Sequence, residues 1–176
     1  MGRTSKQWWA EMKKEPARFQ DWLTDQYRGE TTAAERIEAL RDTYAQGNEP
    51  ARIILSTIAE QEHQHALWVT ELLRVRGIEP AVQDKAERYW GQPLAAVKDL
   101  ATACAVGAHA ERMRLERIET IALDSEAPED VRAVFQRILL QERFHERAFR
   151  FLSTPEALEA TRAAHELGRV ALGLSP

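Results

Sequence analysis

The chain of 176 residues has a single cysteine, Cys104, and this scarcity limits its chemistry. A disulfide framework and a cysteine-based zinc or iron–sulfur site are excluded, because each needs several cysteines. Glycine and proline are also few, with 8 and 7 residues, and they cluster between segments of helical pattern. No apolar run approaches the length of about 20 residues that a membrane-spanning helix needs.

An excess of positive charge is absent too. Lys and Arg number 24 against 28 Asp and Glu, which gives a net charge of −4. Nucleic acids and anionic membranes attract basic surfaces, so neither is an expected partner. The first residues contain no apolar segment of the kind found in signal peptides, and we therefore expect a cytoplasmic protein.

Alternating runs of Val, Ile and Thr are nearly absent, whereas Ala, Leu, Glu, Arg and Gln dominate, which indicates an all-α chain. Apolar residues recur at spacings of three and four in four long segments. We expect residues 1–176 to form one domain, a four-helix bundle over about 17–152 with an N-terminal arm and an extra C-terminal helix at about 155–172. The bundle helices are expected at about 17–46, 50–76, 93–123 and 129–152.

The segment 77–92 connects the second and third predicted helices. About 16 residues span at most ~53–58 Å when extended. This is enough to run the length of the bundle, so the second and third helices can be parallel. We therefore expect two helical hairpins joined by a long crossover rather than a simple up-down-up-down bundle.

Two copies of a Glu-x-x-His motif stand out in the second and fourth helices. Each copy has a lone glutamate about 32 residues upstream, on the preceding helix, and the surroundings repeat as well, with an offset of 80 or 81 residues. Glu-x-x-His places both side chains on one helix face, one turn apart. The set of interest is Glu30, Glu62, His65, Glu111, Glu142 and His145.

These four carboxylates and two imidazoles predict a site for two metal ions. They lie on the apolar lines of their helices, where unpaired carboxylates are very costly to bury. The helix faces that carry these six residues have no Lys or Arg close to them in the pattern, so metal ions are the expected counter-charge. Oxygen and imidazole ligands suit iron or manganese.

The pattern resembles that of the ferritin-like di-iron carboxylate superfamily, and residues 20–152 are most similar to rubrerythrin-type proteins. The resemblance implies that all six residues are metal ligands and that Glu62 and Glu142 bridge two Fe ions, with Mn or a mixed Fe/Mn centre as an alternative. It also implies an enzyme, a di-iron oxidoreductase that activates or reduces O2 or hydrogen peroxide. Electrons would come from a separate donor, and a homodimer is a plausible assembly.

Two departures from typical rubrerythrins keep other functions open. The chain has no Cys-x-x-Cys iron domain, and Arg114 stands where that family has a further glutamate. One alternative is a di-iron hydroxylase or oxygenase acting on an organic substrate. It predicts an apolar pocket beside the small residues Ala33, Ala34, Gly107 and Ala108. Another is a non-redox role, in iron handling or as a metal-stapled structural bundle.

A further Glu-x-x-His pair, Glu60 and His63, lies two residues out of frame with the second-helix copy. About half of the other residues on the same helix face are polar, so we expect this pair to flank the site or to face solvent. His165 lies outside the repeat and is also expected to be exposed.

Overall fold

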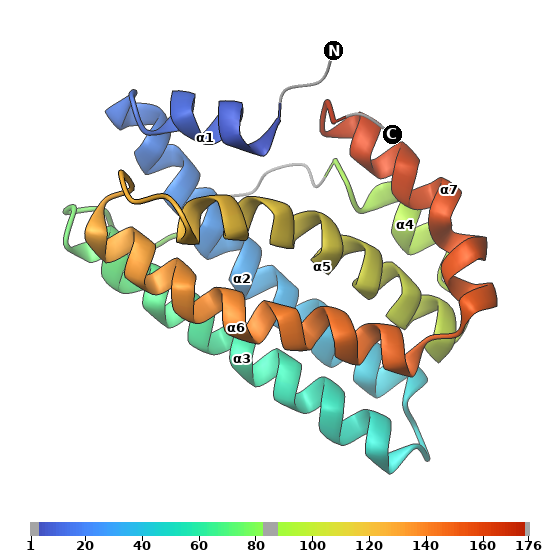
Figure 1. Ribbon diagram of the computed structural model, residues 1–176. Coiled ribbons are helices and arrows are strands. Elements are labelled where there is room, and N and C mark those ends of the chain that lie inside the picture. Colours follow the sequence, from blue (N-terminus) through green and yellow to red (C-terminus); the bar gives the residue numbers. More distant parts are fainter. Residues whose placement is uncertain (1–3, 83–87, 175–176) are drawn as a thin grey trace.

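The computed structural model describes residues 4–82 and 88–174. Its described residues form seven helices and no strand, which confirms the all-α prediction (Figure 1). In chain order the helices are α1 (Ser5–Met12), α2 (Pro16–Tyr44), α3 (Glu49–Arg74), α4 (Gly91–Ala95), α5 (Leu100–Ala122), α6 (Glu129–Leu152) and α7 (Pro155–Ala171).

Helices α2 and α3 form one antiparallel hairpin, and α5 and α6 form the other (Figure 1). The first hairpin turns at Gly47, whose φ of 75° is a left-handed conformation that favours glycine. Helix α3 then begins after Asn48, whose side chain accepts a hydrogen bond from the Ala51 amide. The two hairpins pack with α3 against α6, while α2 and α5 meet only sparingly.

The third long helix begins later than predicted. We expected it to start near Pro93, but that proline belongs to the short helix α4, and α5 begins only at Leu100. The reason is a capping box: the Asp99 carboxylate accepts a hydrogen bond from the Thr102 amide at 2.8 Å, and the Thr102 hydroxyl accepts one from the Asp99 amide at 3.0 Å. The reciprocal cap stops the helix from extending further toward its N-terminus.

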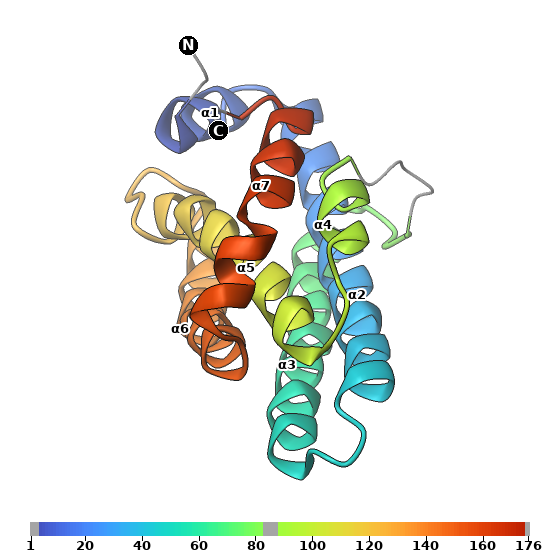
Figure 2. The same cartoon turned by 90° about the vertical axis from the view of Figure 1, so that its right-hand side faces the viewer.

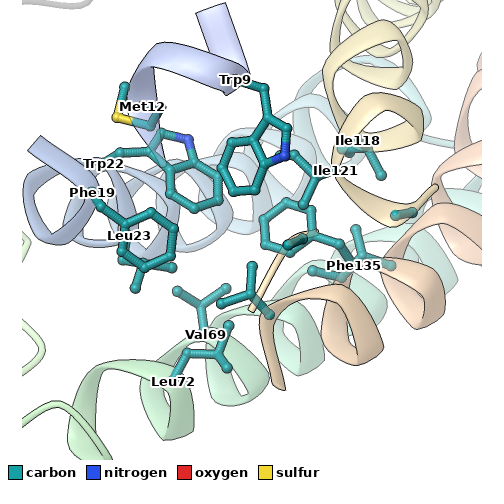
Figure 3. Close-up of a cluster of buried hydrophobic side chains, with 14 of the residues drawn as sticks. Trp9, Met12, Phe19, Trp22, Leu23, Val69, Leu72, Ile118, Ile121 and Phe135 are labelled. Carbon is teal, nitrogen blue, oxygen red and sulfur yellow. The ribbon is translucent and has the colours of Figure 1, made fainter. Parts of the chain in front are cut away.

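One apolar cluster fills the end of the bundle where α1 crosses it (Figure 3). Trp9 of α1 is 2% exposed and packs on Trp22 and Phe19, and its indole nitrogen donates a hydrogen bond to Asp124 at 2.7 Å. The predicted N-terminal arm is therefore a helix anchored by Trp9. The ring of Phe135 in α6 packs against Trp22 of the same cluster.

A second apolar cluster fills the opposite end and contains Leu55, Cys104 and Phe149. Leu55 comes early in α3 and Cys104 early in α5, whereas Leu72 and Ile121, late in these helices, belong to the first cluster. Helices α3 and α5 therefore run parallel, as the long crossover requires. The two clusters leave a layer between them at the middle of the bundle.

Helix α7 packs along the outside of α5 (Figure 2). His165 of α7 stacks on His109 at 4.9 Å between ring centroids, and its Nδ1 lies 2.6 Å from the Tyr89 hydroxyl. Burial and the neighbouring His109 lower the pKa of His165 to about 4. The expectation of an exposed His165 was wrong, because the face of α7 that carries it packs against α5 and Tyr89. Within residues 4–82 and 88–174, none of the helices combines the length and the apolar character that a membrane-spanning helix requires.

We predict that Phe135→Ala lowers the free energy of unfolding by about 3–5 kcal/mol, because it leaves a cavity in the first cluster. Phe151 lies on the same helix but is 77% exposed, so Phe151→Ala serves as the matched control and should change stability by less than about 0.5 kcal/mol. Urea unfolding of the metal-free proteins measures both. Similar losses in the two variants would contradict the placement of Phe135 in the core.

Candidate metal centre

The structure brings all six residues predicted as ligands to the middle layer of the bundle. One glutamate comes from α2 and one from α5, while α3 and α6 each supply a Glu-x-x-His pair. Five of the six side chains are fully buried and Glu111 is 7% exposed. The full set is Glu30, Glu62, His65, Glu111, Glu142 and His145.

Their ligand atoms form two overlapping groups. Glu30 and His65 belong to the first group and Glu111 and His145 to the second, and in each group the atoms lie within 4.8 Å of one another. Glu62 and Glu142 belong to both groups. Two carboxylates shared between two such groups is the arrangement expected of bridging ligands.

The buried atoms that face this centre suit a metal. Both oxygens of Glu30, Glu62 and Glu142, and Nδ1 of both histidines, form no hydrogen bond among the described residues. His65 Nδ1 lies 3.4 Å from Glu62 and His145 Nδ1 lies 3.3 Å from the same carboxylate. Burying polar atoms without hydrogen-bond partners costs folding free energy. Divalent ions would bind the carboxylate oxygens and the imidazole nitrogens together and so remove this cost.

Two glutamines hold the histidine rings, a role that was not predicted from the sequence. His65 Nε2 lies 2.7 Å from Gln141 Oε1, and His145 Nε2 lies 2.9 Å from Gln61 Oε1. Each Nε2–H donates to a glutamine on the opposite hairpin, which leaves Nδ1 directed at the centre. The signal was available in the repeat, because each Glu-x-x-His follows a glutamine directly.

Without metal, the histidines carry positive charge. Burial lowers the pKa of His65, but the neighbouring carboxylates of Glu30 and Glu62 raise it more, to about 10. For His145 the same balance between burial and its carboxylate neighbours gives a pKa of about 9. Binding of a metal at Nδ1 therefore has to displace a proton from each ring.

An arginine enters the site, contrary to the expectation that no cation lies at this level. The Arg114 guanidinium contacts Glu30 and lies 3.3 Å from Glu142 and 3.7 Å from Glu62. Its Cα is off the inward line of α5. Because side chains on a helix lean toward its N-terminus, however, the long arginine reaches back to the level of Glu111. Arg114 therefore pairs with three of the four candidate carboxylate ligands.

Arg114 contributes to large differences between the pKa values of the buried carboxylates. Burial alone would raise all their pKa values, but Arg114 and the histidines lower the pKa of Glu62 and bring that of Glu142 to about 2. Burial and the charges of Glu142 and Glu62 instead raise the pKa of Glu111 well above its ordinary value. In the metal-free protein Glu111 therefore favours its protonated form more than an exposed glutamate does.

The out-of-frame pair behaves as expected. Glu60 and His63 are exposed, and His63 pairs with Glu38 at 3.2 Å on the surface. The pair shares its helix and its spacing with Glu62 and His65 but points to solvent. It provides a natural control for experiments on the buried motif.

A cavity of about 870 Å³ lies between α2 and α5 and reaches the centre at Glu111 and Arg114. The small residues predicted to border a pocket divide into two groups. Ala33 and Gly107 line the cavity, whereas Ala34 and Ala108 are fully buried and are not among its lining residues. A Cβ on Gly107 would lie 2.8 Å from the Phe149 ring, so this glycine also permits the close packing of α6.

Two helical hairpins with a buried cluster of carboxylates and histidines at mid-height define a protein of the ferritin-like class. The family model for rubrerythrin matches residues 21–153, and the chain belongs to this family. The predicted resemblance is thereby confirmed. A search of curated proteins and a search of solved structures found no match.

Removal of the Arg114 charge should destabilise the metal-free protein more than the metal-bound one. Arg114→Met leaves buried carboxylates without their counter-ion, and we expect a loss of about 3 kcal/mol in the free energy of unfolding. With Mn²⁺ bound, the metal would supply the missing charge and the loss should shrink. Urea unfolding with and without Mn²⁺ measures the difference.

The control is Arg112→Met, an exposed arginine on the same helix. It should change stability by less than about 0.5 kcal/mol in both states. An Arg114→Met loss of equal size with and without Mn²⁺ would show that the arginine stabilises the fold independently of the candidate centre.

Proposed function

We propose that this chain is a di-iron oxidoreductase that reduces O2 or hydrogen peroxide. The observation that carries the proposal is the pair of overlapping ligand groups that share Glu62 and Glu142. A site for one metal would need only one such group. Membership of the rubrerythrin family supports a di-metal centre.

In this proposal Glu30 and His65 would hold one ion, and Glu111 and His145 would hold the other. Glu62 and Glu142, which belong to both ligand groups, would be shared by the two ions. Four carboxylates offset the charge of two divalent ions, which suits iron, and manganese or a mixed pair is a second possibility for the same donor set. Gln61 and Gln141 fix the imidazole rings through their Nε2 hydrogens.

Two ferrous ions in this centre would supply the electrons for reducing the oxidant. Five of the six ligand side chains are fully buried between two apolar clusters, and the cavity beside Glu111 and Arg114 gives a small oxidant a path to the centre. Arg114, beside Glu30 and Glu142, offers a positive charge to a negatively charged product. A separate electron donor would restore the ferrous state, since one cysteine cannot form a Cys-x-x-Cys iron site within this chain.

A second candidate function is oxidation of an organic substrate by the same centre. The observation that favours it is the cavity of about 870 Å³ that reaches Glu111 and Arg114. A peroxidase acting on a molecule as small as hydrogen peroxide would not need so large a space. The two candidates share the metal centre and differ in what the oxidant acts on.

The test is single-turnover oxidation of protein loaded with Fe(II) without oxygen. Rapid mixing with hydrogen peroxide or O2 should produce ferric absorption, and peroxide consumption should be about one molecule per two Fe(II), because each peroxide accepts two electrons. Comparing the two rates separates a peroxidase from an O2-reactive oxidase. Absence of reaction with either oxidant, in protein that binds two Fe(II), would contradict the proposal and favour a non-redox role.

Matched variants come from the two Glu-x-x-His pairs on α3. His65→Ala should remove at least one of the two ions and abolish the paired stoichiometry. His63→Ala, two residues away and 51% exposed at its side chain, should leave binding and oxidation as in the wild type. Loss of activity in both variants would indicate damage to α3 rather than loss of a ligand.

A further inference from the structure

The cavity between α2 and α5 has the size of a ligand site. Its volume of about 870 Å³ falls within the range of roughly 300–1,000 Å³ typical of pockets for small organic molecules. Small residues from both helices line it at the level of the metal centre, namely Gly29 and Ala33 of α2 and Gly107 and Ala110 of α5. Apolar side chains such as Ile37 form much of the remaining wall.

Gly29 indicates that the space is a feature of the fold rather than a packing fault. It lies inside α2, where glycine costs helix stability relative to alanine. A Cβ built on Gly29 would meet no atom within 4 Å, so close packing does not require a glycine here. What the missing side chain provides is width in the cavity, one residue from Glu30.

The described walls of the cavity carry more positive than negative charge. Three carboxylates line it, those of Asp21, Asp25 and Glu111. The arginines number six: Arg18, Arg28, Arg36, Arg88, Arg114 and Arg117. This balance favours a molecule that carries an anionic group on an apolar body.

Arg114 connects the cavity to the metal centre. Its side chain is 24% exposed and lines the cavity, while its guanidinium pairs with Glu30, Glu62 and Glu142 in the metal-free protein. Two divalent ions would neutralise these carboxylates and repel the guanidinium. The nearest open space is the cavity, where the charge would face a bound molecule.

We propose that the cavity binds a small organic molecule with an apolar body and one anionic group, and that Arg114 binds this group after metal ions take over its carboxylate partners. As a substrate site the cavity depends on the proposed function, but binding itself can be measured without any reaction. Because Arg114 exchanges partners, metal and anion should each strengthen the binding of the other.

The first test compares two probes of similar shape by calorimetry, 2-naphthoate and its neutral counterpart 2-naphthalenemethanol. Mn²⁺-loaded wild-type protein should bind 2-naphthoate about tenfold more tightly than the metal-free protein does, since a charge-assisted Arg–carboxylate pair is gained. The neutral probe should bind both states equally. Equal binding of 2-naphthoate in the two states would overturn the coupling.

Arg114→Gln separates the arginine from the metal as the partner of the anion. In this variant 2-naphthoate should bind metal-free and Mn²⁺-loaded protein with similar affinity, about tenfold more weakly than it binds loaded wild type. If the gain with Mn²⁺ persists in Arg114→Gln, the carboxylate binds the metal directly and the role of Arg114 is refuted.

Ala33→Leu tests the cavity with all charges left in place. The larger side chain should fill the space and weaken both probes about tenfold or more. Ala133→Leu, at an exposed position of α6 outside the cavity, is the control and should bind like wild type. Binding by Ala33→Leu as tight as by wild type would refute the cavity as the site.

Counting bound Mn²⁺ in the same samples keeps the two proposals apart. Two ions per chain without probe binding would overturn the cavity proposal and leave the metal centre standing. Probe binding without tight metal would refute the metal centre and the partner exchange of Arg114.

Discussion

Burial of four carboxylates at mid-height of the bundle is the constraint on which the rest of the structure depends. Apolar clusters fill the bundle on both sides of this layer, so the charges are largely removed from water, and the cavity reaches the layer at Glu111 and Arg114. The histidines and Arg114 supply positive charge in the metal-free protein, and burial beside two other carboxylates raises the pKa of Glu111. Positive groups therefore offset much of the carboxylate charge without metal, and a metal ion has to displace protons and a guanidinium in order to bind.

The same layer explains why the two hairpins pack unequally. Helices α3 and α6 exchange hydrogen bonds between His65 and Gln141 and between His145 and Gln61, which join the hairpins across the pseudo-twofold axis. Helices α2 and α5 meet through the ion pair of Arg114 with Glu30, and the large cavity lies between them. One side of the candidate centre is thus held rigidly, and the other is open to a ligand.

Most of the fold followed from sequence because helical periodicity and the internal repeat agree over α2, α3, α5 and α6. The start of α5 was misplaced because Pro93 suits a first turn, whereas the true start depends on the side-chain cap of Asp99. The six candidate ligands were found because motif and repeat coincide. Arg114 was read only as a departure from a family pattern, since its reach depends on a long side chain that periodicity does not describe. The exposure of His165 depended on how α7 packs, which no local pattern determines.

The most direct test of the account is anomalous diffraction at the iron edge from crystals loaded with Fe(II) without oxygen. We predict two iron peaks per chain, one beside Glu30 and His65 and the other beside Glu111 and His145, with Glu62 and Glu142 between them. Arg114 should have left its carboxylate partners. A single peak, with Arg114 still paired to Glu30, would contradict the di-metal centre and show that the arginine permanently replaces one ion.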